Sequence, residues 1–211
     1  MIHTPLRLVP ATLLAALALL SGSARADFFN AETGLAAPDR TVDFESAVLA
    51  PNEAVSDQFL DQGLKFDSAF ANADMNPAFA HFNGNRVGNF RANVGSLTDF
   101  AIHFVKPVSA AAFAMVTADG GVSTFEAYFH GSPVETVTAA TSLTNPVNIY
   151  GFRDIVFDEL KIHTNTTDRA LIIDNLQFIN APVPEPASVG LLLPGLGLLM
   201  WLKRRRSAQA R

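Results

Sequence analysis

The chain of 211 residues contains no cysteine and has a formal net charge of −5 at pH 7. Without cysteine the protein can form no disulfide, thiolate zinc site, iron–sulfur cluster or cysteine nucleophile. Between residues 27 and 183, 8 Lys and Arg stand against 19 Asp and Glu, a net charge of 8 − 19 = −11. This acidic balance argues against nucleic acid as a partner, because phosphate binding needs clustered cations.

Residues 1–26 predict a secretory signal peptide. Arg7 precedes an apolar run at residues 8–20, and the small-residue pattern Ala24-Arg25-Ala26 follows it. This order is typical of a signal peptide read by the Sec export machinery and cleaved after Ala26. The alternative is an uncleaved membrane anchor, which is disfavoured because the run is shorter than the ~20 residues that a membrane-spanning helix needs.

The C-terminal end has three parts: a Pro-rich spacer at 181–186, an apolar stretch at 187–202 and a basic tail at 203–211. Proline fixes its own φ and disfavours helix in the residue before it, so a helix can begin only after the spacer. A helix over 187–202 would be about 24 Å long, slightly short of a ~30 Å hydrocarbon core, and a thinned bilayer can accommodate it. The basic residues predict a cytoplasmic tail and an exported domain.

This end resembles the PEP-CTERM sorting signal of Gram-negative bacteria. The residues that match its motif are Pro184, Glu185 and Pro186, and those that match its basic tail are Arg204, Arg205 and Arg206. The resemblance implies recognition by an exosortase, a membrane-embedded transpeptidase similar to a cysteine protease. It further implies removal of the tail and an association with exopolysaccharide at the cell surface. The alternative is a single-span anchor that no enzyme processes.

After a linker expected at residues 27–40, residues 41–180 predict one all-β domain. Strand patterns, some with clear alternation of polar and apolar side chains, occur at residues 101–105, 123–130, 147–152, 155–163 and 170–178. Gly, Asn, Asp and Pro separate these patterns, a spacing that predicts a β-sandwich or jelly roll with phenylalanines in its core.

The order of these segments resembles jelly-roll, galactose-binding-like modules. The resemblance uses the segments Val42-Asp43-Phe44-Glu45, Gly63-Leu64-Lys65-Phe66 and Ile173-Asp174-Asn175-Leu176. In such modules the first and last strands lie side by side and often hold calcium, which takes six to eight oxygen ligands. The resemblance implies a calcium site at Glu45 and Asp174, with Asp43 and Asn175 as further oxygen donors. The alternative is that these residues are solvated strand ends and a turn.

The segment at residues 79–91 combines aromatic and amide side chains with Arg86 and Arg91 in an otherwise acidic domain. Such a loop can bind a sugar by ring stacking and planar hydrogen bonding. The interpretation we prefer is a β-hairpin that turns at Asn83-Gly84, with Phe82 and Phe90 in the core.

The sequence shows no G-x-S-x-G elbow, Walker pattern or dinucleotide fingerprint. Asp158 and Glu159 are neighbours in a strand pattern, so they point to opposite faces and do not form the carboxylate pair that glycoside hydrolysis needs. Our leading hypothesis is a non-enzymatic surface or extracellular-matrix protein, anchored first in the inner membrane and then sorted by an exosortase. The alternatives are a carbohydrate-binding module for exopolysaccharide and a divergent hydrolase.

Overall fold

The structure, a computed structural model, describes residues 27–72, 79–91, 95–96, 100–165 and 169–182. The predicted signal peptide, the PEP motif, the helix at 187–202 and the basic tail lie outside these residues. Within them, no helix is both long enough and apolar enough to cross a membrane.

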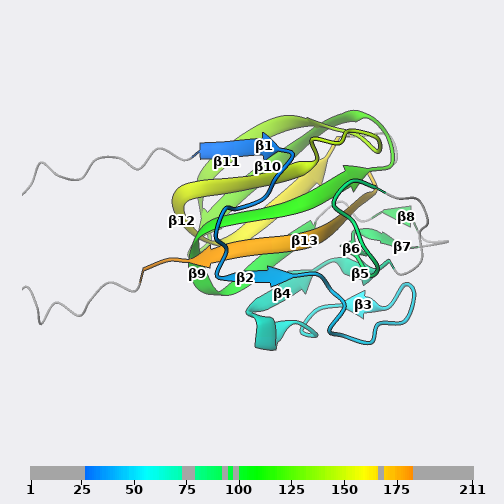
Figure 1. Cartoon of the computed structure of the whole chain (residues 1–211), viewed down its shortest axis with the longest axis horizontal. Helices are drawn as coiled ribbons and strands as arrows, with labels where there is room; N and C mark the ends of the chain where they lie inside the picture. The colour runs from blue at the N-terminus through cyan, green and yellow to red at the C-terminus, as the bar shows by residue number, and fades with distance from the viewer. Residues whose placement is uncertain (1–26, 73–78, 92–94, 97–99, 166–168, 183–211) are drawn as a thin grey trace, which may run out of the picture. The chain divides into compact units, whose positions relative to one another are not determined.

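Five long strands form the body of the domain (Figure 1): β9 (Phe100–Thr117), β10 (Gly121–Phe129), β11 (Ser132–Thr141), β12 (Ile149–Thr164) and β13 (Leu171–Asn180). Eight short strands surround them: β1 (Asp27–Ala31), β2 (Arg40–Val42), β3 (Ala54–Val55), β4 (Leu64–Asp67), β5 (Ala69–Ala71), β6 (Val87–Gly88), β7 (Phe90–Arg91) and β8 (Gly95–Ser96). A short 3-10 helix, Leu60–Gln62, precedes β4.

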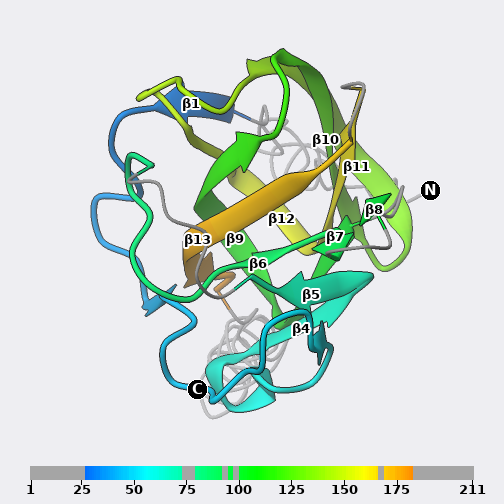
Figure 2. The same ribbon diagram turned by 90° about the vertical axis from the view of Figure 1, so that its right-hand side faces the viewer.

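Eleven of the described strands form one antiparallel sheet. Eight of them follow the order β11-β10-β12-β9-β13-β6-β5-β3, and the other three pair with members of this path. β1 pairs with β12, β2 with β13 and β4 with β9. Figure 2 shows β6 beside β13 and β5 on the other side of β6. The remaining strands, β7 and β8, pair only with each other.

The sheet bends into two layers where β9 and β12 are interrupted. The pairing of β12 with β9 shifts between Arg153 and Phe157. Pro107 lies at the corresponding point of β9, where its missing N–H interrupts the hydrogen-bond ladder. On one side of this break β9 pairs with β4, and on the other side it pairs with β13. The first layer is therefore β11-β10-β12-β9-β4, and the second contains the other halves of β9 and β12 with β1 and β13.

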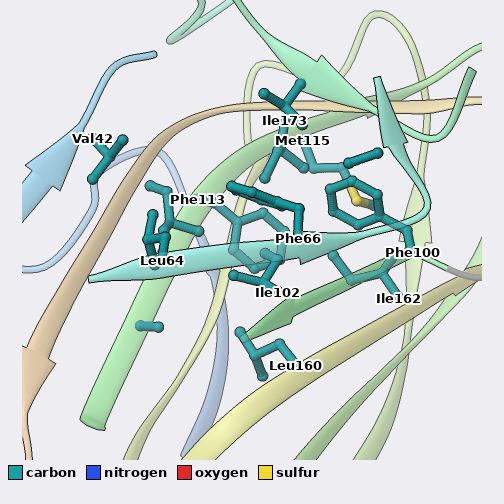
Figure 3. Close-up of a cluster of buried hydrophobic side chains, with 14 of the residues drawn as sticks. Val42, Leu64, Phe66, Phe100, Ile102, Phe113, Met115, Leu160, Ile162 and Ile173 are labelled. Atoms are coloured by element: carbon teal, nitrogen blue, oxygen red, sulfur yellow. The ribbon is translucent and has the colours of Figure 1, made fainter. Parts of the chain in front are cut away.

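Side chains of both layers meet in a single large core (Figure 3). Phe66 and Ile102 come from the first layer, and Phe113, Met115 and Ile173 come from the second. The described residues include ten buried phenylalanines: Phe44, Phe59, Phe66, Phe100, Phe104, Phe113, Phe125, Phe152, Phe157 and Phe178. The predicted all-β sandwich with a phenylalanine-rich core is thereby confirmed.

Residues 27–40, expected as a linker, instead contain β1. Its register places Phe28 opposite Phe152. The Phe28 ring also lies 5.2 Å, between ring centroids, from both Phe125 and Phe152. Farther along, the Leu35 N–H donates a 2.8 Å hydrogen bond to Gln177 Oε1. The segment belongs to the domain because its aromatic side chains complete the core.

Candidate functional site

The loop at residues 79–86 does not form the hairpin that its Asn-Gly pair predicts. The chain leaves the loop through β6, which pairs with β5 and β13. Phe82 is half-buried against the side of the sheet near Ile149, while Phe90 lies half-buried on β7. The hairpin prediction is wrong because contacts to β13 and to the turn after β2 hold the loop.

Two carboxylates bind alternate backbone N–H groups of this loop. Asp174 Oδ2 accepts a 2.7 Å hydrogen bond from the Asn83 N–H, and Glu45 Oε1 accepts one from the Asn85 N–H. Gly84 stands between them with a φ of +69°, and a Cβ at this position would overlap the Glu45 carboxylate. Glycine is needed here both for its left-handed backbone and for the space.

Asp174 is completely buried on β13. Burial raises the pKa of its carboxyl group to about 6, and the nearby charge of Glu45 adds to this effect. Hydrogen bonds from the Asn83 and Asn175 N–H groups and the positive charge of Arg86 lower the pKa, but they do not offset burial. Asp174 is thus a buried acid whose negative charge is only partly compensated.

The two arginines predicted for sugar binding lie in different surroundings. The guanidinium carbon of Arg86 lies 5.6 Å from the ring centroids of both Phe79 and Phe82. Arg86 is only 7% exposed, and its Nη1 is buried without a hydrogen-bond partner in the described part of the chain. Arg91 is exposed on β7, with its guanidinium carbon 5.7 Å from the Phe70 ring centroid. Arg86 therefore stacks on the protein's own rings and is largely withdrawn from solvent.

The residues implied for calcium are partly brought together. Pairing of β2 with β13 places Val42 opposite Leu176, the adjacency of opening and closing strands that the resemblance implied. Glu45 and Asp174 thereby reach the same loop. Asp43 Oδ1, however, accepts a 3.2 Å hydrogen bond from the Glu45 N–H, and the Asn175 side-chain amide donates to the His81 carbonyl.

The donor set fits calcium in its chemistry but is small. Both carboxylates offer the oxygen ligands that calcium prefers, and backbone carbonyls can supply more. Among the described residues no group of three or more His, Asp and Glu side chains is arranged to hold a metal. A calcium ion here would depend on Glu45 and Asp174 together with loop carbonyls or water.

A second polar site lies on the outer face of the first layer, where a hollow of about 620 Å³ is open to solvent. Its lining includes Asp67, Ala101, Glu126, Glu159, Lys161 and His163. Our sequence reasoning did not identify this site. The available signal was the alternation in the strands at 101–105, 123–130 and 155–163, whose polar positions fall on one face.

Comparison with known proteins provides no family for this chain. No family model and no curated protein matches it. Among solved structures, it is similar to a carbohydrate-binding module, CBM32-3, from a family 31 glycoside hydrolase of Clostridium perfringens. The identity is 12% and the TM-score 0.33, over 55% of this chain and 91% of that one.

Two further structures show a similar level of likeness. The K2 cleaved adhesin domain of Lys-gingipain is 13% identical with a TM-score of 0.36, over 66% of this chain and 98% of that chain. TmCBM61, solved in complex with β-1,4-galactotriose, is 9% identical with a TM-score of 0.33, over 58% and 94% of the two chains. Scores this low transfer neither a ligand nor a site to this chain.

Proposed function

We propose that this chain is a non-enzymatic protein of the cell surface or extracellular matrix, exported and then sorted by an exosortase at Pro184-Glu185-Pro186. One observation supports this proposal most directly. β1 lies within the part of the chain that would remain after signal cleavage, and β13, the last described strand, ends at Asn180, just before the Pro-rich spacer. Removal of both ends therefore leaves all of the described strands in place.

The arrangement of the acidic residues supports a non-catalytic role. Glu45 and Asp174 are engaged by backbone N–H groups of the loop. Asp158 accepts hydrogen bonds of 3.1 and 3.2 Å from the His130 N–H, whereas Glu159 Oε1 lies 3.4 Å from Lys161 Nζ. Asp158 and Glu159 thus serve separate partners, which does not suit the paired acid and base of a hydrolase.

The test of sorting is the intact mass of the mature protein from cells with and without the exosortase. We expect the C-terminal mass to be lost only when the enzyme is present, and replacement of Glu185 by Ala to abolish the loss. A variant with Glu32, in the described domain, replaced by Ala serves as the matched control and is expected to be processed normally. An identical C-terminal mass in both strains would show that the segment is a simple anchor.

Carbohydrate binding by the sandwich is the second candidate function. The polar hollow on the first layer favours it, because its volume lies within the ~300–1,000 Å³ of small-molecule sites. We further propose that the sandwich has the jelly-roll, galactose-binding-like topology. The pairing of β2 with β13 supports this proposal. In this proposal the sorting signal delivers the domain to the exopolysaccharide outside the cell.

The partly compensated charge of Asp174 favours a calcium ion bound by Asp174 and Glu45. A divalent cation would stabilise two neighbouring carboxylates, one of them fully buried, and would stabilise the fold by mass action. We expect excess chelator to lower the Tm and added calcium to restore it, with no response in a Glu45→Gln, Asp174→Asn double variant. An identical Tm of the wild-type protein in chelator and in calcium would exclude the ion.

A further inference from the structure

The outer face of the first layer arranges polar side chains in rows across four strands. The register of β4, β9, β12 and β10 places His103 beside Glu159, and Glu159 beside Tyr128. In the next row Ala101 stands between Asp67 on β4 and Lys161 on β12, and Glu126 follows on β10. Side chains at these directly opposite positions are near enough to interact.

These side chains form a continuous chain of contacts. His103 Nε2 lies 2.7 Å from Asp67 Oδ2, and His103 Nδ1 lies 3.9 Å from Glu159 Oε1. Lys161 Nζ lies 3.4 Å from the same Glu159 oxygen and 4.2 Å from the centroid of the Tyr128 ring. The Tyr128 hydroxyl donates a 3.3 Å hydrogen bond to Glu126 Oε2. The charged side chains that line the hollow are therefore held to one another and to His103 and Tyr128 beside it.

Ala101 explains why the face is hollow at this point. It is the smallest side chain of its row and lies between the longer Asp67 and Lys161. Its methyl group forms part of an apolar floor, while carboxylates and an ammonium group stand around it. A ligand that enters the hollow thus meets an apolar base and several hydrogen-bonding groups, the combination typical of a small-molecule site.

From these features we propose that the hollow binds a saccharide that carries no acidic groups. This inference rests on the carbohydrate-binding function proposed above. Asp67, Glu126 and Glu159 accept hydrogen bonds from sugar hydroxyl groups, and Lys161 donates to sugar oxygens. Three carboxylates outnumber the single lysine, so uronate or sulfated sugars are repelled. Lys161 covers the Tyr128 ring, and recognition depends on hydrogen bonds more than on ring stacking.

The test is affinity electrophoresis of the mature full chain through gels that contain a neutral galactan, a neutral glucan or alginate. We expect retardation by one of the two neutral polymers and none by alginate. Ala101→Leu places a larger side chain on the floor of the hollow. Glu126→Gln removes the charge of a carboxylate that accepts hydrogen bonds from sugar hydroxyl groups. Each variant should weaken binding about tenfold or more. Ala140→Leu, an exposed position on β11 outside the hollow, is the matched control and should bind like wild type.

The outcomes separate the site from the function. Wild-type binding that survives in both Ala101→Leu and Glu126→Gln would overturn the hollow as the site and leave carbohydrate binding in place. If none of the three polymers retards the wild-type protein, both the site and the carbohydrate-binding function are overturned. Preference for alginate would overturn the ligand class. If Ala101→Leu shows no thermal unfolding transition and is therefore not folded, the binding of Glu126→Gln decides the result.

Discussion

Asp174 on β13 and Glu45 in the turn after β2 bind two backbone N–H groups of the same loop, those of Asn83 and Asn85. The two acids are far apart in the sequence and approach each other because β2 pairs with β13. The conformation of the loop at 79–86 therefore depends on long-range contacts, and the changes that break them should be measurable as a loss of stability.

Replacement of Asp174 by Ala is expected to lower the free energy of unfolding by about 2 kcal/mol at pH 5. The variant removes the acceptor of two part-buried hydrogen bonds, those from the Asn83 and Asn175 N–H groups. Each such hydrogen bond contributes about 0.5–1.5 kcal/mol. Urea unfolding measures the loss. Asp174→Asn retains an acceptor and should lose less, and Asp119→Ala, in an exposed turn, should change stability by less than about 0.5 kcal/mol. Equal stability of all three variants would contradict the role of Asp174.

The raised pKa of Asp174 predicts a pH dependence with a definite sign. The folded protein binds this proton more tightly than the unfolded chain, because its pKa rises from 3.8 to about 6. The stabilising contribution is complete below the unfolded pKa and is lost as the pH rises through about 6. At about 1.4 kcal/mol per pKa unit, the loss is at most about 3 kcal/mol.

Urea unfolding in chelator at several values between about pH 4 and pH 7 measures this loss, with Asp174→Asn as the variant that cannot titrate. Wild-type stability relative to that variant should fall as the pH rises. A constant difference across this interval would show that Asp174 ionises as readily in the folded protein as in the unfolded one. Added calcium should reduce the pH dependence if the ion binds the charged carboxylate.

The sequence predicted strands best where one face of the strand is buried and the other is exposed to solvent. Alternation identified the segments that became β10 and the second half of β12. It missed residues 108–117 of β9. Nearly every side chain in that half of the strand is buried, so polar and apolar residues do not alternate with a period of two. Alternation also missed β1, which pairs with β12. The polar, Gly-containing stretch that follows β1 led us to expect a linker there.

The candidate sites show the same division between local pattern and register. The resemblance to jelly-roll modules placed Glu45 and Asp174 near each other, since it specified which strands are neighbours. The hollow depends on which residues stand opposite one another across β4, β9, β12 and β10, and the bulges that set this register have no clear local signal. Ala101 is an ordinary small residue in the sequence and becomes informative only between Asp67 and Lys161.

Gly151 on β12 is expected to tolerate no side chain. An added Cβ would overlap the Ala111 carbonyl oxygen and would lie 2.9 Å from Ala112 Cα, both in the backbone of the neighbouring strand. Because backbone atoms of a central strand cannot move aside cheaply, Gly151→Ala should destabilise the domain by about 2 kcal/mol or more. Gly120→Ala is the control, since its nearest neighbour is Ser142 Cβ at 4.0 Å. Thermal unfolding of the two variants tests the close approach, and similar Tm values would contradict it.

Phe28 provides the test of whether β1 belongs to the domain. Its ring contacts Phe125 and Phe152 at 5.2 Å between centroids, so Phe28→Ala should lower the free energy of unfolding by about 2–3 kcal/mol. This is slightly less than the ~3–5 kcal/mol of a fully buried phenylalanine, because Phe28 is only partly buried. Val48→Ala is the control, since Val48 is 102% exposed and its removal should change stability by less than about 0.5 kcal/mol. Urea unfolding with unchanged midpoints for both variants would return residues 27–31 to the role of a linker, whereas a loss confined to Phe28→Ala would establish that these residues are part of the folded domain.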